Sequence, residues 1–249
     1  MIILKSAEEI EKMARACLIV AKTLDRMGEM VKPGITTKEI DRFADGYIRS
    51  QNALPAFKGY RGFPASICAS LNNEVIHGIP SDRVLKEGDI IGVDLGAYKD
   101  GFYGDAAYTF PVGGIDEKAE KLLKITEESL YKGIANARPE KRLTDISCAI
   151  QKHIEENGFS VVRAFVGHGI GRELHEDPQV PNFGTPGRGP RLRSGMTLAI
   201  EPMVNEGGYE VTVLEDGWTA VTLDGGLSAH FEHTILVTSD EPRILTKIG

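Results

Sequence analysis

The chain lacks the features of secreted and membrane-spanning proteins. Its 249 residues include only three cysteines, which form no CxxC pair, and no Asn-x-Ser/Thr acceptor. No stretch approaches the ~20 apolar residues of a membrane span, and the most apolar one, residues 14–21, is interrupted by Arg15. The first residues lack the basic region of a signal peptide. We therefore expect a cytoplasmic protein with reduced cysteines and no membrane partner.

Positive charge is also scarce. Lys and Arg total 29 against 36 Asp and Glu, which gives a net charge of −7 and excludes a general nucleic-acid binder. One local basic cluster remains, Arg188, Arg191 and Arg193, and it is open to two interpretations. It could touch ribosomal RNA, or it could be a solvated loop, which we favour. The 41% hydrophobic and 26% charged fractions are typical of a globular protein.

The first part of the chain predicts two helices followed by strands. Ser6 and Glu9 form a capping box that begins a helix fading near Gly28. Thr36 and Glu39 form a second capping box, which begins a helix to about residue 50. Apolar runs then predict strands over residues 66–71 and 89–95.

The same order returns about a hundred residues later. The periodic segment 117–137 predicts a long helix, which Arg138-Pro139 ends. Thr144 is expected to cap a further helix ending near Asn157, and strands are expected from Ser160 onward.

This repetition favours an ancient duplication over a solenoid, which needs shorter and more numerous repeats. No low-complexity linker separates the halves, which span about 1–112 and 113–249. We therefore predict a single α+β domain over residues 1–249, with internal pseudo-symmetry and a site at the seam.

Two aspartates occur where strands rarely hold them. Residues 89–110 predict a β-hairpin with its turn near Lys99-Asp100-Gly101. A turn centred on Lys99-Asp100 would make Asp94 and Asp105 direct cross-strand partners, with Cβ atoms about 5 Å apart. A shared proton, a basic side chain or a metal would then have to offset their repulsion. Alternatively, one aspartate faces solvent on an edge strand, and a turn at Asp100-Gly101 would shift the register.

Two further acids and one histidine extend this pattern. Glu201 lies in the apolar run Leu-Ala-Ile-Glu-Pro-Met, and Glu232 is expected inside a second strand. His168 lies in Gly-His-Gly-Ile-Gly, where glycines allow close approach to the ring. Each residue alone could have an ordinary structural role, but four acids in strand-like runs, two in each half, favour a shared site.

Charge favours two metals in such a site. Four carboxylates and a neutral imidazole sum to −4, so one divalent cation leaves −2 and two leave zero. Two-metal centres space their ions by about 3.5–4 Å. Oxygen-rich ligation with one imidazole suits Mn, Fe(II), Co or Zn, and differs from a structural thiolate zinc site.

Together these motifs resemble the ligand signature of the methionine aminopeptidases. The resemblance rests on Asp94, ten intervening residues, Asp105, then Gly-His168-Gly, Ile-Glu201-Pro-Met and Phe-Glu232-His-Thr. It extends to the segments 74–80 and 174–178 and covers nearly the whole chain. It implies the pseudo-two-fold pita-bread fold, an antiparallel sheet covered by helices.

The resemblance also implies a role for each ligand. Asp94 is the chelating ligand of one metal, and Asp105 and Glu232 bridge both metals. His168 and Glu201 are ligands of the other metal. A water or hydroxide bridging the two metals is the implied nucleophile.

Three residues are implied to be catalytic. Glu201 handles the proton, His175 steadies the developing oxyanion and His77 contacts the scissile amide. The implied substrate-binding residues of the apolar methionine slot are Tyr60, Phe63, Cys68 and Trp218, with His77 and His175 at its edge. The sequence departs from some family members at Phe57 and Leu174.

Only 32 residues separate His168 from Glu201, which leaves no room for the large helical insertion of the type II enzymes. The resemblance is therefore to the short bacterial type I form. The expected function is removal of the initiator methionine from nascent proteins and peptides by a monomer, with the ribosome as a further partner. Two alternatives are a prolidase-like Xaa-Pro aminopeptidase, which normally carries a preceding domain, and a non-catalytic peptide- or ribosome-binding relative.

Overall fold

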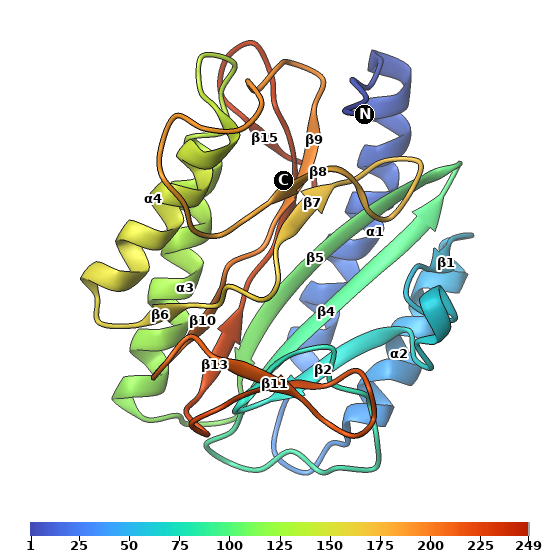
Figure 1. Ribbon diagram of the computed structural model, residues 1–249. Coiled ribbons are helices and arrows are strands. Elements are labelled where there is room, and N and C mark those ends of the chain that lie inside the picture. The colour runs from blue at the N-terminus through green and yellow to red at the C-terminus, as the bar shows by residue number, and fades with distance from the viewer. Residues whose placement is uncertain (249) are drawn as a thin grey trace.

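The computed structural model describes residues 1–248, and its helices flank a central group of antiparallel strands (Figure 1). The helices are α1 (Ala7–Met30), α2 (Thr37–Ser50), α3 (Glu117–Ala135) and α4 (Leu143–Glu156), with a short 3-10 turn η1 (Tyr60–Gly62). The strands of the first half are β1 (Leu54–Pro55), β2 (Ile67–Leu71), β3 (Glu74–Ile76), β4 (Ile90–Lys99) and β5 (Phe102–Pro111). Among the described residues, no helix is long and apolar enough to cross a membrane.

The strands of the second half are shorter. They are β6 (Ser160–Val161), β7 (Gly167–Gly169), β8 (Glu176–Val180), β9 (Thr197–Ile200), β10 (Met203–Asn205), β11 (Val211–Val213), β12 (Ala220–Thr222), β13 (Ser228–His230), β14 (His233–Leu236) and β15 (Arg243–Ile244).

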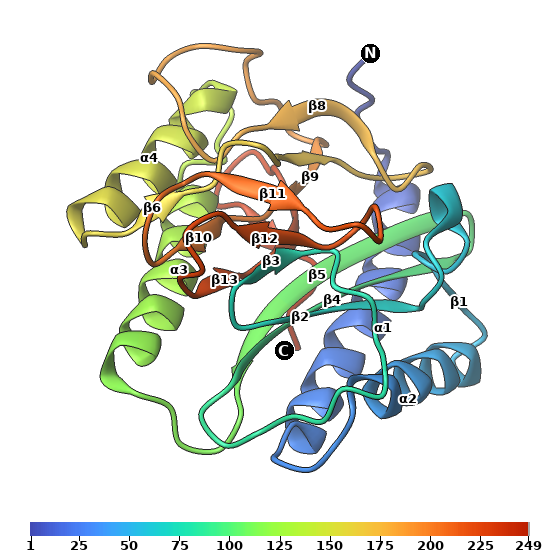
Figure 2. The same cartoon turned by 60° about the horizontal axis from the view of Figure 1, so that its bottom comes forward.

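The strands pair in four antiparallel groups. In the first half β4 lies between β1 and β2 and also pairs with β5, and in the second half the order is β15-β14-β9-β7-β8. The order β13-β10-β6 completes the second half, while β12 pairs with β11 on one side and with β3 of the first half on the other (Figure 2). The predicted α+β class is confirmed.

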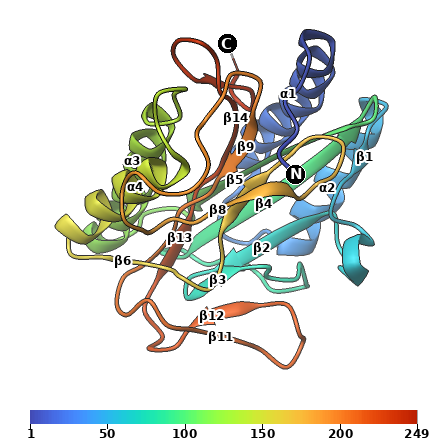
Figure 3. The ribbon, with the colours of Figure 1, turned by 45° about the horizontal axis from the view of Figure 1, so that its top comes forward.

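Each half has its own hydrophobic core. One core joins α1 and α2 to β2, β4 and β5, and the other joins α3 and α4 to the strands of the second half. The helix pairs therefore lie on opposite flanks of the strands (Figure 3). A third, smaller cluster lies between them and includes Phe63, Cys68 and Leu174.

Both predicted capping boxes are present. The Ser6 hydroxyl accepts the Glu9 backbone N–H, and the Glu9 carboxylate accepts the Ser6 N–H at 2.8 Å. The Thr36–Glu39 box has the same reciprocal bonds. The first helix continues past Gly28 to Met30, two residues further than predicted.

The predicted Thr144 cap is wrong. Helix α4 begins at Leu143, and Arg142 occupies the cap position, where its N–H donates to the Asp145 carboxylate at 2.8 Å. The Thr144 hydroxyl instead donates to the Arg188 carbonyl and accepts the Arg188 N–H. Thr144 thus anchors a distant loop rather than the start of its own helix.

A buried ion pair ties the N-terminal segment to β8. Lys5 Nζ lies 2.5 Å from Glu176 Oε2, and their side chains are only 2% and 9% exposed. The other Glu176 oxygen accepts the backbone N–H groups of Arg172 and Glu173. This network holds the turn that carries His175.

Replacing Lys5 by Met should destabilise the protein by about 3–5 kcal/mol, because Glu176 would keep a buried charge without its cation. Urea unfolding measures the change. Lys12→Met is the matched control, since Lys12 pairs with the exposed Glu8 four residues away and should cost less than about 0.5 kcal/mol. Equal losses in the two variants would contradict the importance of the buried pair.

Candidate metal centre and substrate pocket

The β4–β5 hairpin places the two aspartates on one face, in a register shifted from the first expectation. The turn is Asp100-Gly101, both with positive φ, so Asp94 lies opposite Ala107 and Asp105 lies opposite Gly96. Direct pairing of Asp94 with Asp105 is therefore wrong. The aspartates are diagonal neighbours on the same face, which still brings their carboxylates together.

Glu201 and Glu232 lie at breaks between strands. Glu201 directly follows β9, and Asn182 Nδ2 donates to its carbonyl at 2.9 Å. Glu232 lies between β13 and β14 rather than inside a strand as predicted. The reason is a change of partner, because the Glu232 N–H donates across to the Ala107 carbonyl of β5. That bond brings Glu232 beside the hairpin that carries both aspartates.

His168 points into the same space from β7. A Cβ atom at Gly167 or Gly169 would lie 2.4 Å or 2.2 Å from a backbone oxygen, so glycine is required on both sides of the histidine. The ring nitrogen Nδ1 lies 2.8 Å from the Gly169 carbonyl. With Nδ1–H donating there, Nε2 presents its lone pair, at 3.5 Å from Glu201 Oε1.

The four acids form a cluster without a basic partner. Among residues 1–248, no Lys or Arg forms an ion pair with any of them, and buried oxygens of Asp94, Asp105 and Glu232 accept no hydrogen bond. Burial raises the pKa of Asp94 to about 7. Burial, and then the neighbouring carboxylates, raise the pKa values of Asp105, Glu201 and Glu232 well above their usual range.

This donor set fits divalent cations. Ligand atoms of Asp105, His168 and Glu232 lie within 4.8 Å of one another, and all three residues are buried. Orphaned carboxylate oxygens and one imidazole suit Mn, Fe(II), Co or Zn. Cations would also neutralise the four carboxylates, which no Lys or Arg among the described residues does.

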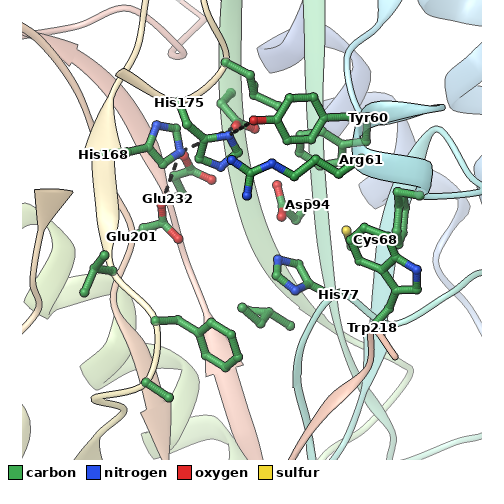
Figure 4. Close-up of a pocket in the computed structure, with 18 residues that line it drawn as sticks. Tyr60, Arg61, Cys68, His77, Asp94, His168, His175, Glu201, Trp218 and Glu232 are labelled. Carbon is green, nitrogen blue, oxygen red and sulfur yellow. Dashed lines mark hydrogen bonds and ion pairs between the residues drawn. The ribbon is translucent and has the colours of Figure 1, made fainter. Parts of the chain in front are cut away.

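One pocket contains every predicted site residue (Figure 4). The cavity has a volume of about 290 Å³, and Figure 4 shows His168, Glu201 and Glu232 on one side of it and Cys68 and Trp218 on the other, with Asp94 and His77 between them. The predicted residues that line it are Tyr60, Phe63, Cys68, His77, Asp94, Asp105, His168, His175, Glu201, Trp218 and Glu232. The structure therefore brings all eleven predicted residues together in one pocket.

The apolar end combines residues from separate segments of the chain. Phe63 meets the Trp218 ring edge-on, with ring centroids 5.2 Å apart, and the Asp216 carboxylate holds Trp218 by accepting its backbone N–H. Cys68 on β2 lies directly opposite Asp94 on β4. Burial, with Asp94 adding to it, raises the pKa of the Cys68 thiol, which therefore stays protonated and forms a wall of the pocket.

Two histidines lie between the apolar and acidic ends. His175 Nδ1 lies 2.8 Å from the Tyr60 hydroxyl, and the two rings stack. Burial, and then the charge of Arg61, lower the pKa of His175 to about 4, so the ring is neutral at pH 7. With Tyr60 donating to Nδ1, His175 presents Nε2–H as a donor. His77 meets Trp218 edge-on, and burial lowers its pKa as well.

Several lining residues were not predicted. Phe165 directly precedes the Val-Gly-His168 segment, so proximity to that motif could have indicated it. His230 does not line the pocket but lies behind it, two residues before Glu232 and beside Glu201. His230 Nε2 is buried without a hydrogen bond, 3.9 Å from Glu201 Oε2. Nothing in the sequence distinguished Arg61. Phe57 and Leu174, the two departures from the family pattern, both line the pocket.

Buried acids around an imidazole, open to a pocket, fit a metal-dependent hydrolytic centre, and residues 11–239 match metallopeptidase family M24, to which the chain belongs. It is 59% identical to the methionine aminopeptidase of Clostridium perfringens and 54% identical to methionine aminopeptidase 1 of Bacillus subtilis, covering all of each chain. These matches confirm the resemblance derived from the motifs.

Solved structures agree with these sequence matches. The methionine aminopeptidase of Thermotoga maritima superposes with a TM-score of 0.98 at 51% identity over the whole of both chains. The prolidase of Pyrococcus furiosus gives 0.79 at 24% identity, covering 99% of this chain and 66% of the other, which shows a shared fold alone. The pita-bread fold is therefore confirmed.

Binding of a divalent cation should release protons. Because burial raises the pKa of Asp94 to about 7, and burial and neighbouring carboxylates raise those of Asp105, Glu201 and Glu232 well above their usual range, a cation must displace protons from the site. Apparent affinity should therefore fall as the pH is lowered, by about tenfold per pH unit for each proton displaced. Calorimetric titration of Mn²⁺ into chelator-treated protein, in two buffers of different ionisation enthalpy, counts the protons. Buffer-independent heats at pH 6 would refute the prediction, and Asp82→Asn, an exposed site, is the control.

Proposed function

We propose that this chain is a methionine aminopeptidase that removes the N-terminal methionine of nascent proteins and peptides in the cytoplasm. The observation that carries the proposal is one pocket with uncompensated carboxylates at one end and a closed apolar slot at the other. Full-length relatives with that name support it. A peptide with methionine in the slot would place its first amide bond beside the acids.

We propose Asp94, Asp105, His168, Glu201 and Glu232 as the ligands of two divalent ions. Asp94 would chelate one ion, His168 and Glu201 would hold the other, and Asp105 and Glu232 would bridge them. The ions supply Lewis acidity, which polarises a carbonyl and makes water more acidic. The identity of the ions depends on availability, since the same ligands accept Co, Mn, Fe(II) or Zn.

Three side chains would act on the reacting peptide. Glu201, whose pKa is raised by burial, would take the proton of the attacking water on its carboxylate and deliver it to the leaving amine. His175, neutral and held by Tyr60, would donate from Nε2 to the oxygen that gains charge. His77 would contact the scissile amide. The nucleophile, a water or hydroxide held by the ions, stays a prediction from the family resemblance.

The methionine side chain would be selected by shape. Phe63, Cys68 and Trp218 form the apolar walls, and Tyr60 closes the pocket near His175. A thioether chain fills such a slot well because it is unbranched and polarisable.

The remaining expectations are proposals of the same kind. We propose a monomer with one catalytic unit, whose pseudo-repeat halves are residues 1–112 and 113–249, and the ribosome as an additional partner. A prolidase-like activity is disfavoured because those relatives are only distant. A non-catalytic relative is disfavoured because all five proposed ligands and both histidines share one pocket.

Two peptides distinguish the candidate activities. Purified protein should release methionine from Met-Ala-Ser, stop after treatment with a chelator and recover when Mn²⁺ or Co²⁺ is added. Ala-Pro-Ser should remain intact, because its small first residue leaves the apolar slot empty. Liquid chromatography of the products measures both. Cleavage of Ala-Pro-Ser alone would replace the proposal with a proline-directed one, and cleavage of neither would favour a binding protein.

Glu201→Gln should lower kcat by about 10²- to 10⁴-fold, because it removes both the proton carrier and a charged ligand. Metal content measured on the same sample separates the two effects. Glu11→Gln, on the exposed face of α1, is the matched control and should keep full activity. An unchanged rate with Glu201→Gln would refute its role.

A further inference from the structure

Arg61 occupies an unusual position at the mouth of the pocket. It is the middle residue of η1, with φ of 50°, a left-handed conformation that side-chain-bearing residues seldom adopt. This turn directs the side chain across the pocket toward His175 and Asp94 (Figure 4). Arg61 is exposed to solvent, yet its side chain lines the same cavity as the acids.

The Arg61 guanidinium has no partner of opposite charge. Among residues 1–248, no carboxylate lies within 4 Å of it, whereas the exposed Arg172 pairs with Glu9 at 2.9 Å. Its Cζ atom instead lies 5.3 Å from the centre of the Tyr60 ring, so the planar group rests on an aromatic face. A guanidinium held in this way has its hydrogen-bond donors free for an incoming anion.

The orientation of the substrate determines what Arg61 would meet. Methionine would fill the slot of Phe63 and Trp218, and the scissile carbonyl would lie by His175. The peptide beyond the cleaved bond must then leave through the exposed mouth, beside Tyr60 and Arg61.

We propose that Arg61 is a specificity-determining residue that binds an acidic side chain of the substrate beyond the second residue. The inference rests on the proposed function and adds a substrate class, peptides that begin Met-small-acidic. Arg61 offers the acidic side chain of such a peptide a forked donor at the exit. Because the guanidinium is exposed, its contribution should equal that of one surface ion pair, about two- to fivefold in kcat/KM.

The test compares three peptides that differ at one position. Met-Ala-Asp-Gly, Met-Ala-Asn-Gly and Met-Ala-Lys-Gly are used with amidated C-termini, so that the terminal carboxylate cannot mimic the acidic side chain. The Mn²⁺-loaded wild-type protein should cleave the Asp peptide about two- to fivefold more efficiently than its Asn isostere, and the Lys peptide least. High salt should reduce this preference.

Arg61→Gln should remove the preference for Asp over Asn, which is measured as the ratio of the two kcat/KM values within each variant. Arg61→Lys should retain part of it. Arg188→Gln, in the exposed loop after β8, is the matched control and should leave the ratio unchanged.

The outcomes separate the inference from the function on which it rests. If no peptide loses methionine, the proposed function fails. If all three are cleaved with equal efficiency, or the ratio survives Arg61→Gln, the function stands and the inference is overturned. An equal loss of rate for all peptides in Arg61→Gln also overturns it, because Arg61 would then act through His175 rather than through the substrate.

Discussion

Mutual repulsion among four buried carboxylates is the constraint on which the rest of the structure depends. Asp105 and Glu232 are 4% and 3% exposed, and no basic residue among the described ones compensates the group. Such a cluster is tolerable only where the scaffold is stiff and a cation can enter. The long β4–β5 hairpin supplies the stiffness, and the two cores behind it keep the carboxylates from moving apart.

Most of the titratable groups around the acids in the pocket are uncharged. Burial keeps His77, His168 and His175 uncharged near pH 7, so these rings act as ligands and donors without competing with cations for the acids. The apolar slot adds little polarity of its own, because the Cys68 thiol stays protonated. The positive charge of Arg61 lies only at the exit, where it does not pair with the acids.

Local sequence rules predicted the parts of this fold that depend on neighbours in the chain. The capping boxes of α1 and α2 were predicted because their partners lie three residues apart, and the site was predicted because acids in apolar runs are unusual. The cap of α4, the hairpin register and the position of Glu232 were not. Each depends on a distant backbone group, the carbonyl of Arg188 or Ala107, or on a turn that differs by one residue. The position of Arg61 in the pocket was not predicted, because the sequence alone does not distinguish it from any other exposed arginine in a turn.

The distribution of the proposed ligands has a consequence for the chain as a whole. Asp94 and Asp105 come from the first half, while His168, Glu201 and Glu232 come from the second, and each half has a separate core. A bound cation would therefore act as an additional non-covalent cross-link between the two halves. Binding of the cation would raise the free energy of unfolding by RT ln(1 + [L]/Kd), where [L] is the concentration of free cation. The supply of metal in the cell would therefore affect the stability of the folded chain as well as its catalytic rate.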